Sequence, residues 1–185
     1  QAQHAIFRHA EEGTLEEHFG GILRQEHNYL AISGGGANGA YGAGVLYGWS
    51  ESGTRPEFTL VTGISTGALT APFAFLGSDY DEQLKKVYTT LDTSRILLRR
   101  SIFSIVRGDS LVDSTPLANM LQTYITPEMI TQIAREYRRG RGLYVVTTNL
   151  DACLPVIWNI TRIAASGHPD APARIRSVLL ASASI

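Results

Sequence analysis

The sequence predicts a three-layer α/β/α domain with a mostly parallel central sheet. Short apolar runs rich in β-branched residues alternate with longer segments of helical spacing, as in parallel sheets with crossover helices. Two of these runs end in glycine-rich turns that open helices. The chain has 185 residues, of which 44% are hydrophobic, and contains neither a repeat nor a long linker. We therefore expect residues 1–185 to form a single domain.

The first half of the chain is expected to alternate helices and strands. Thr14 followed by Glu17 forms a capping box, which predicts a helix through about Gln25. The other elements expected in this half are strands at 29–33 and 58–64 and helices at 39–52 and 66–76.

The second half begins with helices and returns to strands. Ser78 and Asp81 can open a helix that runs to about residue 91, and a last helix is expected from Asp170 or Pro172 to about residue 180. Two strands are expected before it, at 143–148 and 154–158. Two further helix starts carry proline in the first turn, and they are Ser114 with Pro116 and Thr126 with Pro127.

Charge and cysteine content exclude several classes of partner. Sixteen basic residues against seventeen acidic ones leave a formal charge of -1, so no global field attracts nucleic acid. The single cysteine, Cys153, excludes an internal disulfide and a cysteine-rich metal site. We expect no metal and no organic cofactor. A cluster of arginines is expected at a solvated helix end, and it comprises Arg135, Arg138, Arg139 and Arg141.

The sequence is typical of a soluble protein. It holds no run of eighteen apolar residues, and its first thirty residues lack a signal-peptide pattern. It opens on Gln1 rather than methionine, which suggests that a segment was removed. The protein is then cytoplasmic or, if a targeting peptide was removed, located in the bacterial envelope or secreted. The residues indicate neither the compartment nor the oligomeric state.

Gly63, Ser65 and Gly67 form a G-x-S-x-G turn between a predicted strand and a predicted helix. In this motif the glycines permit a tight turn that exposes the serine hydroxyl as a nucleophile. The alternative is that the glycines merely close a turn and Ser65 caps the helix. The position of the motif between strand and helix favours the nucleophile.

A second glycine-rich turn, Gly34-Gly35-Gly36-Ala37-Asn38-Gly39, also joins a strand to a helix. Its backbone N–H groups converge at a helix N-terminus and can stabilise an oxyanion or a phosphate. The spacing also fits a dinucleotide-binding fingerprint, which needs an acidic residue at the end of the next strand. That place holds Val61, Thr62 and Gly63, whereas Glu57 precedes the strand, so the dinucleotide hypothesis is disfavoured.

The pairing of G-G-G-A-N-G after one strand with G-I-S-T-G after the next resembles the patatin-like phospholipase family, bacterial type. The resemblance implies a lipid acyl hydrolase in which Ser65 is the nucleophile. It implies an oxyanion hole at the first turn, formed by Gly34, Gly35, Gly36 and Gly39. Phospholipids or other lipid esters are the implied substrates. The family often has Arg or Lys where this chain has Asn38.

The resemblance also implies a catalytic aspartate in an Asp-Gly-Gly or Asp-Gly-Ala motif. Residues 178–184 look like the segment that precedes this motif, but the chain stops there. We therefore expect a truncated piece of a longer protein, with its general base outside residues 1–185. None of the aspartates present is followed by glycine, and they are Asp79, Asp81, Asp92, Asp109, Asp113, Asp151 and Asp170.

Other sites remain as alternatives. A Ser-Asp-His triad could be assembled from Ser65, Asp151 and His168. The stretch 95–107 mixes basic and large apolar residues, as a segment in peripheral contact with a membrane would, although core packing explains it better. A non-catalytic lipid- or phosphate-binding module remains the alternative of a different class. Four histidines lie before the first strand without the spacing of metal ligands, and they are His4, His9, His18 and His27.

Overall fold

The computed structural model of the chain describes residues 26–89 and 115–184. The predicted helix at 14–25 and the basic and apolar stretch at 95–107 lie outside these residues. No helix among those described is long and apolar enough to cross a membrane.

A four-stranded sheet forms the centre of the fold, with the strands in sequence order. The first three strands are parallel, and the fourth runs antiparallel to the third. A turn of four residues joins the last two, which is too short for the crossover that a parallel pair requires. The mostly parallel α/β class is therefore confirmed. The strands are β1 (Tyr29–Ile32), β2 (Leu60–Ile64), β3 (Gly142–Asn149) and β4 (Leu154–Asn159).

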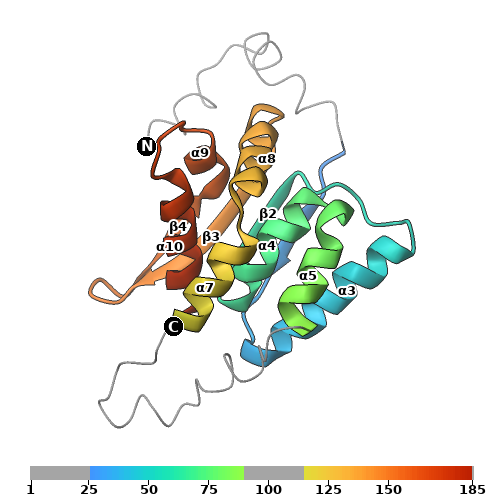
Figure 1. The fold of residues 1–185 in the computed structure, drawn as a ribbon, viewed down its shortest axis with the longest axis horizontal. Coiled ribbons are helices and arrows are strands. Elements are labelled where there is room, and N and C mark those ends of the chain that lie inside the picture. The colour runs from blue at the N-terminus through green and yellow to red at the C-terminus, as the bar shows by residue number, and fades with distance from the viewer. Residues whose placement is uncertain (1–25, 90–114, 185) are drawn as a thin grey trace.

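Helix α4 (Thr66–Leu76) packs on the middle of the sheet, with α3 and α5 on one side of it and α10 on the other (Figure 1). Two short 3-10 turns, η1 and η2, precede α3 and α5. The helical elements are η1 (Gly36–Asn38), α3 (Gly39–Glu51), α4 (Thr66–Leu76), η2 (Ser78–Tyr80), α5 (Asp81–Thr89), α7 (Thr115–Tyr124), α8 (Pro127–Arg138), α9 (Ile160–Ala164) and α10 (Ala171–Ala183).

The strands expected at 29–33 and 58–64 and the helices expected at 39–52 and 66–76 are found within a few residues of their expected ends. Strand β2 is shorter than expected, because Phe58 and Thr59 precede the ladder. Phe58 is buried and packs edge-on against Trp49, so its apolar character serves the core. Helix α9 was not predicted. Asn159 caps it by accepting a hydrogen bond from the N–H of Arg162.

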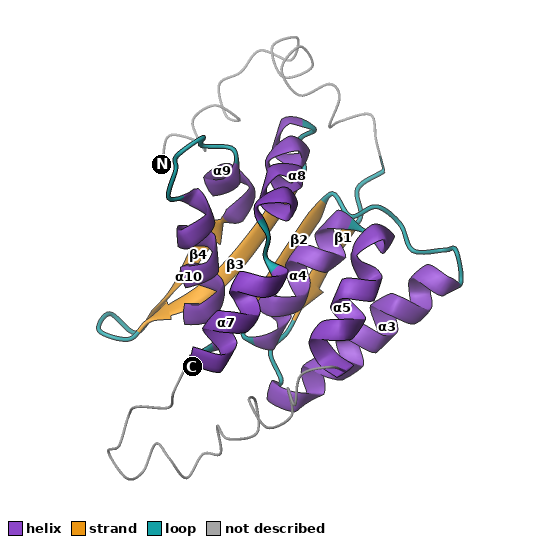
Figure 2. Cartoon of the chain, in the orientation of Figure 1, coloured by secondary structure: helices purple, strands orange, loops and turns teal. Residues whose placement is uncertain are grey.

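The two faces of the sheet differ in burial. Val61, Leu143 and Val145 lie on one face and are fully buried. The helices with the most contacts to the sheet are α4 on β2 and α10 on β3, and Figure 2 shows them lying across the strands. The opposite face carries the exposed side chains of Ile64 and Ile157, which both pair with Val146. The described residues therefore cover this second face only in part.

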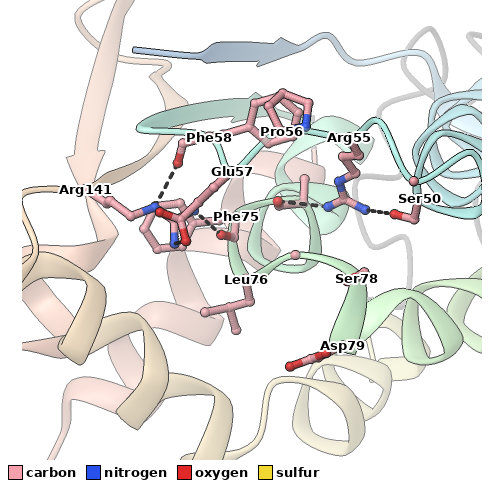
Figure 3. Close-up of a pocket in the computed structure, with 13 residues that line it drawn as sticks. Ser50, Arg55, Pro56, Glu57, Phe58, Phe75, Leu76, Ser78, Asp79 and Arg141 are labelled. Atoms are coloured by element: carbon pink, nitrogen blue, oxygen red, sulfur yellow. Dashed lines mark hydrogen bonds and ion pairs between the residues drawn. The ribbon is translucent and has the colours of Figure 1, made fainter. Parts of the chain in front are cut away.

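Helix α4 is the centre of the core. Every residue from Thr66 to Phe75 is buried, which explains why its sequence is apolar or small all round. Two buried arginines reach its C-terminal end from opposite sides (Figure 3). Arg55 donates to the carbonyl of Ala74, and Arg141 donates to the carbonyl of Phe75. Carbonyls that no further helical turn can satisfy are thereby paired.

Arg141 corrects one expectation about the arginine cluster. It does not lie at a solvated helix end, because its side chain is only 8% exposed and also donates to the carbonyl of Phe58. Gly140 has a φ of 83°, and it turns the chain from α8 back toward the sheet. The position after this turn faces the core, so Arg141 is buried and pairs with Glu136.

Candidate active site

The two glycine-rich turns meet at the carboxyl edge of the parallel strands. One follows β1 and the other follows β2, and these strands are neighbours in the sheet. In open α/β sheets the ligand site lies at this edge, where the chain leaves the strands for helices. The structure thus brings the turns together as the sequence predicts.

Ser65 has a backbone conformation that side chains rarely adopt. Its φ is 54° and its ψ is -125°, between β2 and α4. Such a conformation in a non-glycine residue costs about 1–3 kcal/mol and is concentrated at functional sites. The Ser65 side chain makes no capping hydrogen bond to α4, so the alternative role as a helix cap has no support here.

The flanking glycines of this turn allow the backbone to approach closely. A Cβ on Gly63 would lie 2.5 Å from the carbonyl oxygen of Gly67. A Cβ on Gly67 would collide with the carbonyl oxygen of Ile32, at the end of β1. The strand-turn-helix unit can therefore close only if both positions lack side chains.

Gly34 lies directly beside the serine. A Cβ there would lie 2.9 Å from the Cβ and 3.5 Å from the Oγ of Ser65. Among the described residues, no partner accepts a hydrogen bond from the N–H of Gly34 or Gly35. Gly36 adopts a φ of 55°, and the N–H of Asn38 bonds the carbonyl of Gly35, which completes a compact turn.

Gly39 packs the first turn onto the second. A Cβ at this position would lie 2.9 Å from the Cβ of Thr66 and 3.1 Å from the phenolic oxygen of Tyr88. That phenol lies 2.8 Å from the hydroxyl of Thr70. Burial raises the pKa of Tyr88, and the hydrogen bond with Thr70 opposes this only in part. The phenol of Tyr88 is therefore neutral at ordinary pH. The absence of a side chain at Gly39 lets the first turn pack closely against Thr66 and this phenol.

Ser182 contacts the serine turn from a distant part of the chain. Its Oγ accepts a hydrogen bond of 2.9 Å from the backbone N–H of Ser65. The same hydroxyl donates to the carbonyl of Val146 at 2.6 Å. Ser182 lies in the segment 178–184 that resembles the family, but its contact with Ser65 was not predicted, because a spacing of 117 residues carries no local signal.

The alternative triad is not assembled. Ser182, near the end of α10, touches Ser65, whereas His168 lies just before the beginning of this helix. The length of α10 separates them by roughly 16 Å, at about 1.5 Å per residue. His168 pairs instead with Asp170 at 3.7 Å, and Asp151 lies exposed in the turn after β3.

No acidic or histidine side chain in the described part of the chain forms a hydrogen bond with Ser65. Asp81 is buried in an ion pair with Arg55 at 2.7 Å. This pair lies by Ala74, roughly 13 Å along α4 from Ser65, at about 1.5 Å per residue. Residues 26–89 and 115–184 contain no group of three potential metal ligands. Of the five histidines in the sequence, His27 and His168 fall within these ranges.

A model of the patatin-like phospholipase family matches residues 30–185. The chain belongs to the patatin-like phospholipase family. The match begins in β1 and spans both glycine-rich turns, which contact each other in the structure. The family is one of lipid acyl hydrolases. No curated protein matches the chain. In this member of the patatin-like phospholipases, β2 ends in the serine turn, and Glu57 lies before the strand in an ion pair with Arg139.

Proposed function

We propose that the protein is a serine acyl hydrolase that cleaves ester bonds of lipids, with glycerophospholipids as the substrate class. Ser65 is the nucleophile in this proposal. The observation that carries it is the strained conformation of Ser65 in a turn that presses against Gly34. A strained serine between strand and helix is the arrangement that exposes a hydroxyl to a substrate carbonyl.

The oxyanion hole in this proposal is the turn formed by Gly34, Gly35, Gly36 and Gly39. The N–H groups of Gly34 and Gly35 have no partner among the described residues, and Gly34 lies beside the Ser65 hydroxyl. A tetrahedral intermediate on Ser65 would therefore carry its negative oxygen near these donors. Removal of one such donor costs about 3–4 kcal/mol of transition-state stabilisation in other hydrolases.

The general base in this proposal is an aspartate that follows Ile185 in the protein, as the family's Ser-Asp pair implies. It removes the proton from the Ser65 hydroxyl as the oxygen attacks the ester carbonyl. The alcohol of the lipid then leaves, and water releases the fatty acid from the acyl-serine. The mechanism assigns no step to a metal or organic cofactor, and the protein meets its lipid in peripheral contact with a membrane.

The test uses the full protein, a fluorophosphonate probe and phosphatidylcholine vesicles. The wild type should release fatty acid and form a covalent adduct with the probe, and Ser65→Ala should do neither. Ser78→Ala is the matched control, because Ser78 is an exposed serine just beyond the opposite end of α4. Adduct formation and turnover that persist in Ser65→Ala would refute the proposal. Vesicle binding without any turnover in the wild type would favour a non-catalytic module.

A further inference from the structure

We propose that Ser182 is a positioning residue for the nucleophile, and this inference rests on the proposed function of Ser65. Its hydroxyl lies between the N–H of Ser65 and the carbonyl of Val146, with which it forms hydrogen bonds of 2.9 and 2.6 Å. Ser182 is 3% exposed, so water is largely kept from these bonds. The contact ties the serine turn to both β3 and α10.

The Ser182 hydroxyl bridges the N–H of Ser65 and the carbonyl of Val146. This bridge lies where the β2–β3 ladder stops. Ile64 and Val146 are the last paired residues of that ladder. At Ser65 the backbone turns away with a positive φ, and the next N–H reaches the carbonyl of Val146 through the Ser182 hydroxyl. The hydroxyl therefore replaces the connection that a straight strand would make directly.

The bridge requires a group that accepts and donates at the same time. The N–H of Ser65 can only donate and the carbonyl of Val146 can only accept, so the middle group needs both capacities. A hydroxyl has both, a thiol has them weakly, and a methyl group has neither. Ser182→Ala would leave a donor and an acceptor without partners in a site closed to water.

The bridge also determines which donors are available to an oxyanion. Because the N–H of Ser65 is bonded to Ser182, it points toward α10 and is withdrawn from the substrate side. The oxyanion donors then have to come from other backbone groups, and the N–H groups of Gly34 and Gly35 lie on the turn that touches the Ser65 side chain. Ser182 thus orients the backbone of Ser65. It also removes the N–H of Ser65 from the set of donors available to an oxyanion.

The experiment compares Ser182→Ala, Ser182→Cys and Ser182→Thr in the full protein. Each variant is assayed for kcat and KM on a short-chain p-nitrophenyl ester and for the rate of fluorophosphonate labelling. Ser182→Ala should lower kcat and the labelling rate by about 10- to 100-fold, the effect of a small misplacement of a reacting group, with KM nearly unchanged. Ser182→Thr should restore most of the rate because it keeps the hydroxyl, and Ser182→Cys should fall between them.

Ser177→Ala is the matched control, since Ser177 is an exposed serine on the same helix. Thermal unfolding identifies variants that remain folded. If Ser182→Ala fails to fold, the folded Ser182→Cys variant decides the question. A wild-type labelling rate in a folded Ala or Cys variant would overturn the positioning role and leave the proposed function intact. A wild-type protein that is never labelled would overturn the proposed function and the positioning role together.

Amide hydrogen exchange measures the bridge without relying on turnover. The N–H of Ser65 should exchange slowly in the wild type and in Ser182→Thr. It should exchange faster in Ser182→Ala, while the buried amide of Val145 keeps its rate. Equal exchange at Ser65 in all variants would contradict the hydrogen bond on which the inference depends.

Discussion

A Cβ atom on Gly34 would lie 2.9 Å from the Cβ atom of Ser65. The turn after β1 therefore touches the turn after β2 at the point where the proposed nucleophile stands. This contact accounts for a glycine at position 34 without appeal to backbone conformation, since Gly34 is not among the glycines with positive φ.

The first prediction follows from this contact. Gly34→Ala should lower kcat/KM by at least about 100-fold, because the added methyl group displaces the Ser65 side chain from its working position. The Cβ of Ser65 can move only with its backbone, so the substitution shifts the serine turn itself, and thermal unfolding checks that the variant assayed is folded. Gly48→Ala is the control, because a Cβ at that helical position meets nothing within 4 Å. A Gly34→Ala variant with wild-type kcat/KM would show that the contact is unimportant for the reaction.

A second prediction separates packing from chemistry at Gly67. Gly67→Ala should lower the free energy of unfolding by about 2–3 kcal/mol, the upper part of the usual range for overpacked cores. The added Cβ would meet the backbone carbonyl of Ile32, which cannot rotate away as a side chain can. Urea unfolding measures the change. An unaltered unfolding free energy would mean that β1 and α4 can move apart.

A third prediction concerns the strain at Ser65. Ser65→Gly should be more stable than Ser65→Ala by about 1 kcal/mol, since glycine tolerates a φ of 54° and alanine does not. Neither variant should hydrolyse esters. Thermal unfolding of the two variants in parallel provides the comparison. Equal stability of the two would indicate that the turn relaxes once the hydroxyl is absent.

A fourth prediction concerns the buried ion pair between Arg55 and Asp81, whose side chains are 4% and 7% exposed. Asp81→Ala should lower the free energy of unfolding by about 3–5 kcal/mol, because it leaves an uncompensated guanidinium in the core. Glu82→Gln, which alters an exposed carboxylate one residue away, should leave the unfolding midpoint unchanged. Similar effects of the two substitutions would argue against burial as the cause.

Local patterns predicted most elements, because capping residues, glycine turns and apolar periodicity act over a few residues. Thr126 shows this well, since its hydroxyl caps α8 by accepting from the N–H of Met129 as expected. Each of the two glycine-rich turns was expected to join a strand to a helix, and each does. The antiparallel direction of β4 depends on the turn before it, and the spacing of strands alone does not determine it.

Contacts between distant segments could not be predicted in the same way. Ser182 and Ser65 are brought together only when α10 packs on β3. Arg141 was expected at a solvated helix end, yet its guanidinium donates to the carbonyls of Phe58 and Phe75 in the core. In both cases the decisive partner is a backbone group whose unpaired state is visible only in the folded chain.

The burial of α4 from Thr66 to Phe75 affects how this protein can diversify. A helix without a solvent face tolerates few substitutions, because every change alters the packing of the core. Ser65, which precedes this helix, is therefore held in one position by the core. Changes in substrate selectivity then have to come from residues around Ser65 rather than from α4. Tyr41 is a suitable position for such changes, since it lies on the first turn of α3, close to the glycine turn, and is 79% exposed. A library at Tyr41 and neighbouring exposed positions should change substrate preference while leaving the proposed nucleophile undisturbed.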